Sequence, residues 1–327
     1  MVRSLRNIFI TFYSLLFVLT LPLQKFKAFS PFNPIIKNEY KIAIVEIKTG
    51  KSRHITTGFQ PRVLPCSDKI IFSSPQGLSV IDQDGKNEKL LIKALKPLGY
   101  FNVSADGKKI ALYRNDGGHQ LVVINSDGSG YKKIFDINYP KDPYPVLSPK
   151  SDKILFINGC DLAIINTDGS NYKTLKASNK SSYYDHPRFL PDNDRIIFFE
   201  DDRDKENNAK AMQIKVMSLS SGKETVIGKF NQAMGLEVAK NGLILLRDLK
   251  GKIITKIIDS NNNFKVIYSF KDSYENSLSP DGKYIVAYTN SSISICDTDG
   301  RNKRIILKDK VGTVSRFPEI TNDGKYI

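Results

Sequence analysis

Cysteine, histidine and tryptophan are scarce in this sequence, and their scarcity argues against several kinds of protein. The 327 residues include three cysteines, three histidines and no tryptophan. Cys66, Cys160 and Cys296 lie too far apart for a disulfide framework, so we expect all three to be free and mostly buried. The histidines, which are His54, His119 and His186, are also scattered, and this favours structural roles over a metal site.

Motifs for catalysis and for cofactor binding are absent as well. The sequence has no Gly-x-Ser-x-Gly elbow, no His-Glu-x-x-His and no glycine-rich phosphate loop. This favours a protein that is not an enzyme and that uses no cofactor. The acidic stretch at residues 200–206 offers alternating carboxylates, but it lacks the glycine of a calcium loop and contains Arg203 and Lys205. We therefore predict a solvated loop there, with no metal.

Basic residues never form a run of five, although the formal net charge is +15. They are mostly lysines scattered through turns, which indicates that they reflect the overall composition of the protein and do not form a binding patch. We expect no nucleic-acid partner.

A single long apolar run, at residues 8–23, stands at the start of the sequence behind Arg3 and Arg6. A basic start followed by such a run is typical of a secretory signal, and 16 residues are slightly few for a membrane span. Cleavage after Ser30 is unfavourable because Pro31 follows, so an uncleaved membrane anchor stays open as the alternative. We predict a signal peptide or anchor at 1–30, a linker at 31–39, and a periplasmic or secreted location.

The remaining sequence repeats one phrase seven times. The clearest copy is Asn-Ser-Leu-Ser-Pro-Asp-Gly-Lys-Tyr-Ile at residues 276–285. Each copy ends in an isoleucine, the anchor, and successive anchors are 40 to 48 residues apart: Ile70, Ile110, Ile154, Ile196, Ile244, Ile285 and Ile327. An apolar strand position precedes each anchor, and Asp-Gly or Asn-Gly turns lie between them. This period predicts an all-β protein, a β-propeller with seven four-stranded blades over residues 40–327.

A second phrase, such as Leu-Val-Val-Ile-Asn-Ser-Asp-Gly at residues 121–128, interleaves with the first and predicts the outer hairpin of each blade. One outer hairpin, at residues 42–55, comes before every inner strand, whereas inner strands at 317–327 end the sequence. We therefore predict that residues 320–327 pair with residues 41–47 and that the terminal strands close the last blade, which is short or truncated.

The phrases at residues 278–285 and 185–198 resemble the repeat of TolB-type, WD-repeat-like propellers. TolB is a periplasmic protein whose propeller binds an envelope lipoprotein. The resemblance therefore implies an exported scaffold for a protein or peptide partner, such as an envelope lipoprotein, with membrane contact only through the N-terminal anchor. The α/β domain that precedes the propeller in TolB has no room before residue 41. The repeat also resembles that of oligogalacturonate lyases, which implies a metal-dependent polysaccharide lyase as the alternative function.

The candidate binding residues lie on the inner strands. Side chains alternate along a strand, so the phase opposite the apolar position faces the central channel of a propeller. Aromatic and arginine side chains on this phase are of the types that carry binding energy. The predicted binding set is Gln60, Arg62, Tyr100, Asn102, Tyr144, His186, Arg188 and Arg316. We expect Arg62, Tyr144, His186 and Arg188 to be partly exposed around one opening.

Overall fold

The computed structural model describes residues 40–308 and 319–327, apart from 66, 96–97, 99, 139–143, 180–181, 204–208, 231–232, 251, 272–274, 290–291 and 322–323. The chain divides into two units, Met1–Asn38 and Glu39–Ile327, and all described residues belong to the second. Every regular element among them is a β-strand. Consequently, this part of the chain contains no helix that could cross a membrane.

The strands are grouped here by sheet. The terminal hairpin consists of β1 (Lys41–Val45) and β2 (Ser52–Thr57). Blade 1 consists of β3 (Phe59–Val63), β4 (Lys69–Ser74), β5 (Gly77–Asp82) and β6 (Lys89–Lys93), and blade 2 of β7 (Phe101–Val103), β8 (Lys109–Arg114), β9 (Gln120–Asn125) and β10 (Lys132–Asp136). Blade 3 consists of β11 (Val146–Leu147), β12 (Lys153–Asn158), β13 (Asp161–Asn166) and β14 (Lys173–Lys176), and blade 4 of β15 (Ser182–Phe189), β16 (Arg195–Arg203), β17 (Ala209–Ser218) and β18 (Glu224–Phe230). Blade 5 consists of β19 (Ala233–Val238), β20 (Leu243–Lys250), β21 (Lys252–Asp259) and β22 (Lys265–Lys271), and blade 6 of β23 (Glu275–Leu278), β24 (Tyr284–Thr289), β25 (Ser292–Asp297) and β26 (Arg304–Lys308).

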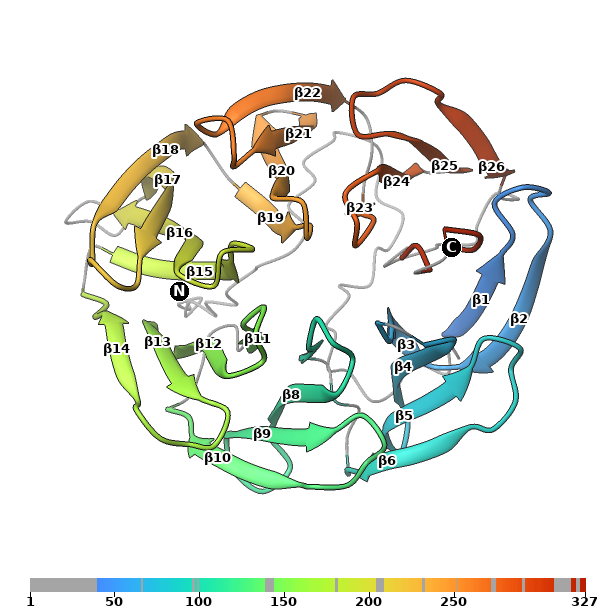
Figure 1. Ribbon diagram of the computed structural model, residues 1–327, viewed down its shortest axis with the longest axis horizontal. Helices are drawn as coiled ribbons and strands as arrows, with labels where there is room; N and C mark the ends of the chain where they lie inside the picture. The colour runs from blue at the N-terminus through green and yellow to red at the C-terminus, as the bar shows by residue number, and fades with distance from the viewer. Residues whose placement is uncertain are drawn as a thin grey trace, which may run out of the picture. The chain divides into compact units, whose positions relative to one another are not determined.

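The blades of this unit follow one another in chain order around a ring (Figure 1). Each blade is an antiparallel meander whose first strand lies at the centre of the ring and whose fourth strand lies at the rim. This confirms the prediction of an all-β propeller. The prediction of seven four-stranded blades was wrong, because the described residues form six such blades and the two-stranded terminal hairpin.

Backbone hydrogen bonds join the last residues of the sequence to the terminal hairpin. Val45 and Ile327 exchange two bonds, with N···O distances of 2.9 and 3.0 Å, and the N–H of Ile47 donates to Lys325 O at 2.8 Å. Ile327 therefore faces Val45 as the anchor Ile70 faces Ile81 in blade 1. In blade 1, however, the second strand runs on past its anchor to Ser74. Among the described residues, the pairing between the C-terminal segment and the hairpin is an isolated bridge, Glu46 to Tyr326, whereas the six blades have longer ladders.

The hydrophobic core fills the spaces between neighbouring blades. Ile71 and Leu78 of blade 1 pack with Ile110 and Leu112 of blade 2, and the other neighbouring blades form similar clusters. Six of the seven anchors are buried: Ile70, Ile110, Ile154, Ile196, Ile244 and Ile285. The apolar residues recur at a fixed period in the sequence because each blade buries them against its neighbours.

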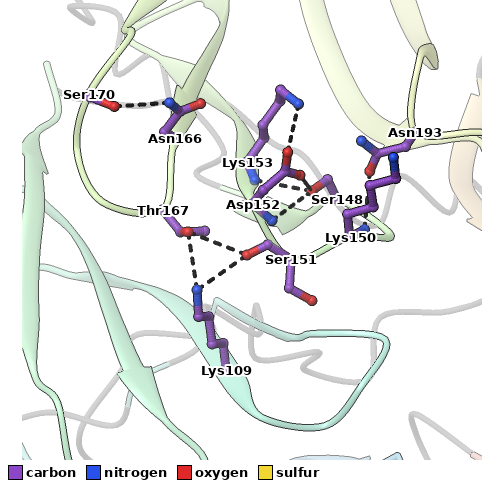
Figure 2. Close-up of polar contacts among 10 residues, drawn as sticks. All are labelled: Lys109, Ser148, Lys150, Ser151, Asp152, Lys153, Asn166, Thr167, Ser170 and Asn193. Atoms are coloured by element: carbon purple, nitrogen blue, oxygen red, sulfur yellow. Dashed lines mark hydrogen bonds and ion pairs between the residues drawn. The ribbon is translucent and has the colours of Figure 1, made fainter.

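The repeated Ser-x-x-x-Asp or Ser-x-Asp turn between the first two strands is held by a buried hydroxyl group. In blade 3, Ser148 Oγ accepts the backbone N–H of Lys153 at 3.1 Å and donates to Asp152 Oδ1 at 2.7 Å (Figure 2). Ser104, Ser279 and Thr321 accept the equivalent N–H in their own repeats. The turn also links blades, because the N–H of Lys150 donates to Asn193 Oδ1 of blade 4 at 3.1 Å. The most regular part of the sequence motif thus has a structural role.

Two further sequence predictions need correction. Residues 200–203 are not a loop, because β16 continues through them; Glu200 Oε2 lies 2.5 Å from Lys215 Nζ, and Asp201 is buried. A carboxylate that pairs with a lysine on the adjacent strand can extend a ladder that its charge would otherwise end. Cys160 and Cys296 are free as predicted, but only Cys296 is buried. Cys66 and residues 204–206 lie outside the described residues.

Candidate functional site

The site candidate is the group of side chains that the first strands of the blades carry to the centre of the ring. The residue directly before the apolar position of each first strand is called the inner position here. The inner positions are occupied by Arg62, Asn102, Val146, Arg188, Glu237, Ser277 and Glu319. They are unlike in charge and size, in contrast to the uniform apolar positions beside them.

Charged inner side chains from four parts of the ring interact with one another. The guanidinium of Arg62 pairs with Glu319, and this carboxylate, followed by Glu237 and Tyr144, raises the pKa of Arg62. Arg188 is affected by Glu237, Arg62 and Tyr144 as well. Blades 1, 3, 4 and 5 and the C-terminal segment therefore contribute these five residues to one electrostatic environment.

Arg188 differs from Arg62 in the partners of its guanidinium. Its Nη1 donates to the carbonyl oxygen of Pro187 at 2.8 Å, and no acidic group among the described residues forms an ion pair with it. Burial lowers the pKa of Arg188, Glu237 opposes this, and the charge of Arg62 lowers the pKa further. A half-buried guanidinium without a close counter-charge is therefore the candidate in this site for contact with an anion.

A row of aromatic rings crosses three blades beside these charges. Tyr100 lies edge-on to Tyr144 at a centroid distance of 4.9 Å, Tyr144 lies 5.2 Å from His186, and His186 lies 5.5 Å from Phe199. Tyr100 also contacts Tyr113, and the Tyr113 hydroxyl bonds to His119 Nδ1. The first three rings are half-buried, so part of each faces solvent. Such rings offer large, rigid contact area at little entropic cost.

The backbone is strained at two matching places in this site. Gln60 and His186 have φ angles of 50° and 47°, and each precedes a proline in a bulge of its first strand. Left-handed conformations of residues other than glycine cost about 1–3 kcal/mol and cluster at binding sites. The Gln60 side chain also has a buried Oε1 that no described residue serves with a hydrogen bond. In blades 1 and 4 the backbone is therefore held in a less stable conformation at the residues that carry these two side chains.

Blade 5 carries a glycine, Gly235, at the position that Gln60, Tyr100, Tyr144 and His186 occupy in blades 1 to 4. A Cβ atom on Gly235 would lie 2.3 Å from Nη2 of Arg247, so the guanidinium occupies the space of the missing side chain. The buried Nε of Arg247 forms no hydrogen bond with any described residue. Arg247 is thus a third arginine on the inner strands.

Seven of the eight predicted site residues lie in the described part of the chain, and all seven are half-buried: Gln60, Arg62, Tyr100, Asn102, Tyr144, His186 and Arg188. Arg316 lies outside it. Whether the seven bind a ligand stays a prediction. Sequence reasoning missed Glu237, Glu319 and Arg247. The two glutamates share the phase of Arg62 and could have been found by it, whereas Arg247 lies on a second strand and gave no signal.

Metal ligands do not gather among the described residues. His54 lies in β2, His119 before β9 and His186 in β15. No three side chains of His, Cys, Asp or Glu within the described ranges lie close enough together to hold an ion. These residues therefore do not fit a metal-dependent site.

Comparisons with known proteins show the fold and leave the function open. No protein-family model and no curated protein sequence matches the chain. TolB from Acinetobacter baumannii is 22% identical with a TM-score of 0.55, over 79% of this chain and 65% of that one. An oligogalacturonate lyase in complex with manganese is 13% identical with a TM-score of 0.57, over 73% and 76%. The tricorn protease gives a TM-score of 0.60 at 13% identity, and the chain covers 34% of its length. At these identities the likeness shows a β-propeller fold alone.

Proposed function

We propose that this chain is an exported, TolB-like propeller that binds a protein or peptide partner at the centre of its ring. The observation that carries the proposal is the ion pair of Arg62 with Glu319, together with the row of half-buried rings of Tyr100, Tyr144 and His186, which come from separate parts of the ring. Mixed charge beside half-buried aromatic rings is the composition of a protein-binding surface. It lies where propellers of many functions place their ligands.

The sequence resemblance supports this choice, and the apolar run at residues 8–23 supports export to the periplasm or beyond. A metal-dependent polysaccharide lyase is the alternative. The fold likeness to an oligogalacturonate lyase does not favour it, because TolB is as similar in fold. The described residues also supply no metal-ligand set. We therefore propose binding of a protein or peptide as the function and keep the lyase as the alternative.

The test is capture of partners from an envelope extract by the purified protein. A central variant would replace Arg62, Tyr144, His186 and Arg188 with alanine. A control variant would replace Tyr131 and Arg301, which are exposed on outer hairpins. Partners that the control retains and the central variant loses would support the proposal. Equal capture by both, with both folded, would contradict it, and cleavage of oligogalacturonate with bound divalent metal would favour the lyase.

A further inference from the structure

One backbone N–H in each first strand points away from its own sheet. In antiparallel ladders alternate residues bond to the partner strand. Ser148, Ser279 and Leu64 donate their N–H groups inward to the second strand, so the preceding residue in each case faces the other way. A first strand has no partner on that side, and its outward N–H needs an acceptor from elsewhere.

In three places the inner side chain of the preceding blade supplies that acceptor. Asn102 Oδ1 accepts the N–H of Leu147, Glu237 Oε2 that of Leu278, and Glu319 Oε2 that of Val63, each at 2.9 Å. The inner position is thus a socket where an oxygen of one blade meets an N–H of the next.

At the other four junctions the inner residue is Arg62, Val146, Arg188 or Ser277, and within the described part of the chain none of them accepts the N–H of the next first strand. Among these four, Arg188 at the junction with blade 5 is a charged residue that forms no ion pair with a described carboxylate, whereas Arg62 pairs with Glu319.

Ala239 donates its N–H to Leu243 O, so the N–H of Val238 points outward by the same alternation. The preceding inner residue is Arg188, and a guanidinium has only donors. None of the described residues accepts the Val238 N–H, and none with a carboxylate pairs with Arg188. This junction therefore has two donors, whereas Asn102, Glu237 and Glu319 supply an oxygen at theirs.

We propose that a carboxylate of a peptide ligand fills this place, accepting from the guanidinium of Arg188 and from the N–H of Val238. The chain contains a related arrangement within one strand. At the junction with blade 1, one oxygen of the Glu319 carboxylate accepts the N–H of Val63 while the other pairs with Arg62, the residue before it. A ligand carboxylate would likewise join an arginine to a first-strand N–H, but across two blades, from Arg188 of blade 4 to Val238 of blade 5.

A peptide with a single carboxylate fits better than a polyanion. Glu237 and Glu319 lie close to the two arginines and would repel further negative charge on the ligand. A polyuronate has a carboxylate on every unit, whereas a peptide can offer one carboxylate and otherwise neutral groups. Tyr144 and His186 lie beside Arg188 and can pack on the rest of a peptide. This inference rests on the proposed function and adds the chemistry of its ligand.

Three capped pentapeptides test the proposal with the full-length protein. The first is acetyl-Gly-Gly-Glu-Gly-Gly-amide, the second has Gln in place of Glu, and the third has Gln and a free C-terminal carboxylate. Binding is followed by nuclear magnetic resonance of the protein labelled with ¹⁵N-valine, where the Val238 amide is assigned by its loss in Val238→Ile. We expect the first or third peptide to move this signal and the second to leave it unchanged. The first or the third alone would identify a side-chain or a terminal carboxylate, respectively.

Two substitutions of one residue sharpen the test. Arg188→Gln should weaken binding of the carboxylate peptide about tenfold, or about 1.4 kcal/mol, because the charged donor is lost. Arg188→Glu should abolish binding, because its carboxylate would itself accept the Val238 N–H, and that variant should fold at least as stably as the wild type. Arg301→Gln, which removes an exposed arginine of an outer hairpin, is the control and should bind as the wild type does.

The outcomes separate this inference from the proposed function. If no carboxylate peptide moves the Val238 signal, or if Arg188→Glu still binds, the inference is overturned. If trigalacturonate binds and neither carboxylate peptide does, the assignment to a peptide is overturned. Loss of partner capture in Tyr144→Ala together with full capture in Arg188→Gln would leave the proposed function standing without the carboxylate contact.

Discussion

Removal of the last three residues, 325–327, should destabilise the propeller by several kcal/mol. Three backbone hydrogen bonds join them to the terminal hairpin. At a net 0.5–1.5 kcal/mol for each bond, their loss costs about 3 kcal/mol. The half-buried side chain of Ile327 packs against Ile47 and Val286, and burial of part of an isoleucine adds about 1 kcal/mol. The expected loss in the free energy of unfolding is therefore about 4 kcal/mol.

Urea denaturation followed by circular dichroism measures this loss, and thermal unfolding should show a fall in Tm of roughly 10 °C. Ile327→Ala is the matched control, because it keeps the backbone bonds and loses only the packing, at about 1 kcal/mol. Blades contact mainly their neighbours, so the truncated protein should open first at this junction, and hydrogen exchange of β1 should rise before that of blade 4. A truncated protein as stable as Ile327→Ala would show that the backbone bonds contribute nothing and would refute the reasoning.

Three smaller predictions concern turns and pH. Ser148→Ala should lower the free energy of unfolding by about 1–3 kcal/mol, because a buried N–H loses its acceptor, whereas Ser170→Ala on an exposed turn should change it little. Gly107→Ala and Gly222→Ala share φ angles near 70°, but only the first places a Cβ against backbone, at 2.3 Å, so urea denaturation should show the larger loss for Gly107→Ala. Hydrogen bonds from an arginine lower the pKa of Asp116, so its contribution is present above the unfolded pKa near 3.9 and is lost as pH falls through the lower folded value. Stability of Asp116→Asn, measured between pH 2 and 6, should therefore fall less with acid than that of the wild type.

Most of the fold could be predicted from the sequence, because each repeat forms the same kind of interface with the next blade and therefore needs the same residue types at the same positions. The isoleucine anchor recurs in all seven copies and an Asp-Gly or Asn-Gly turn in four of them, and these mark buried contacts and tight hairpins. The count of four-stranded blades failed at the copy that ends with Ile327, where the pattern has the right residues but the second strand has no length. The prediction of a loop at residues 200–203 was wrong because the local charge pattern does not show that Lys215, on the neighbouring strand, pairs with Glu200.

The candidate site was harder to predict, because its partners come from different repeats. Asn102 and Leu147, or Glu237 and Leu278, lie one repeat apart in the sequence, and Glu319 and Val63 lie at opposite ends of it. A pattern read within one repeat identifies which side chains share a face, and this placed Arg62 and Arg188 among the binding residues.

What the pattern cannot reveal is which of two equivalent arginines already has a partner. Arg62 and Arg188 occupy the same position in their blades, but Glu319 neutralises the first, and the described part of the chain provides no carboxylate for the second. The difference exists only once the ring brings the C-terminal segment next to blade 1. The presence of a charged residue at the inner position is therefore not enough to identify the site. A glutamate there accepts the N–H of the next blade, whereas an arginine has only donors and cannot. On our proposal, the functional part of the ring is the junction at which the inner position holds an arginine that no described carboxylate pairs with.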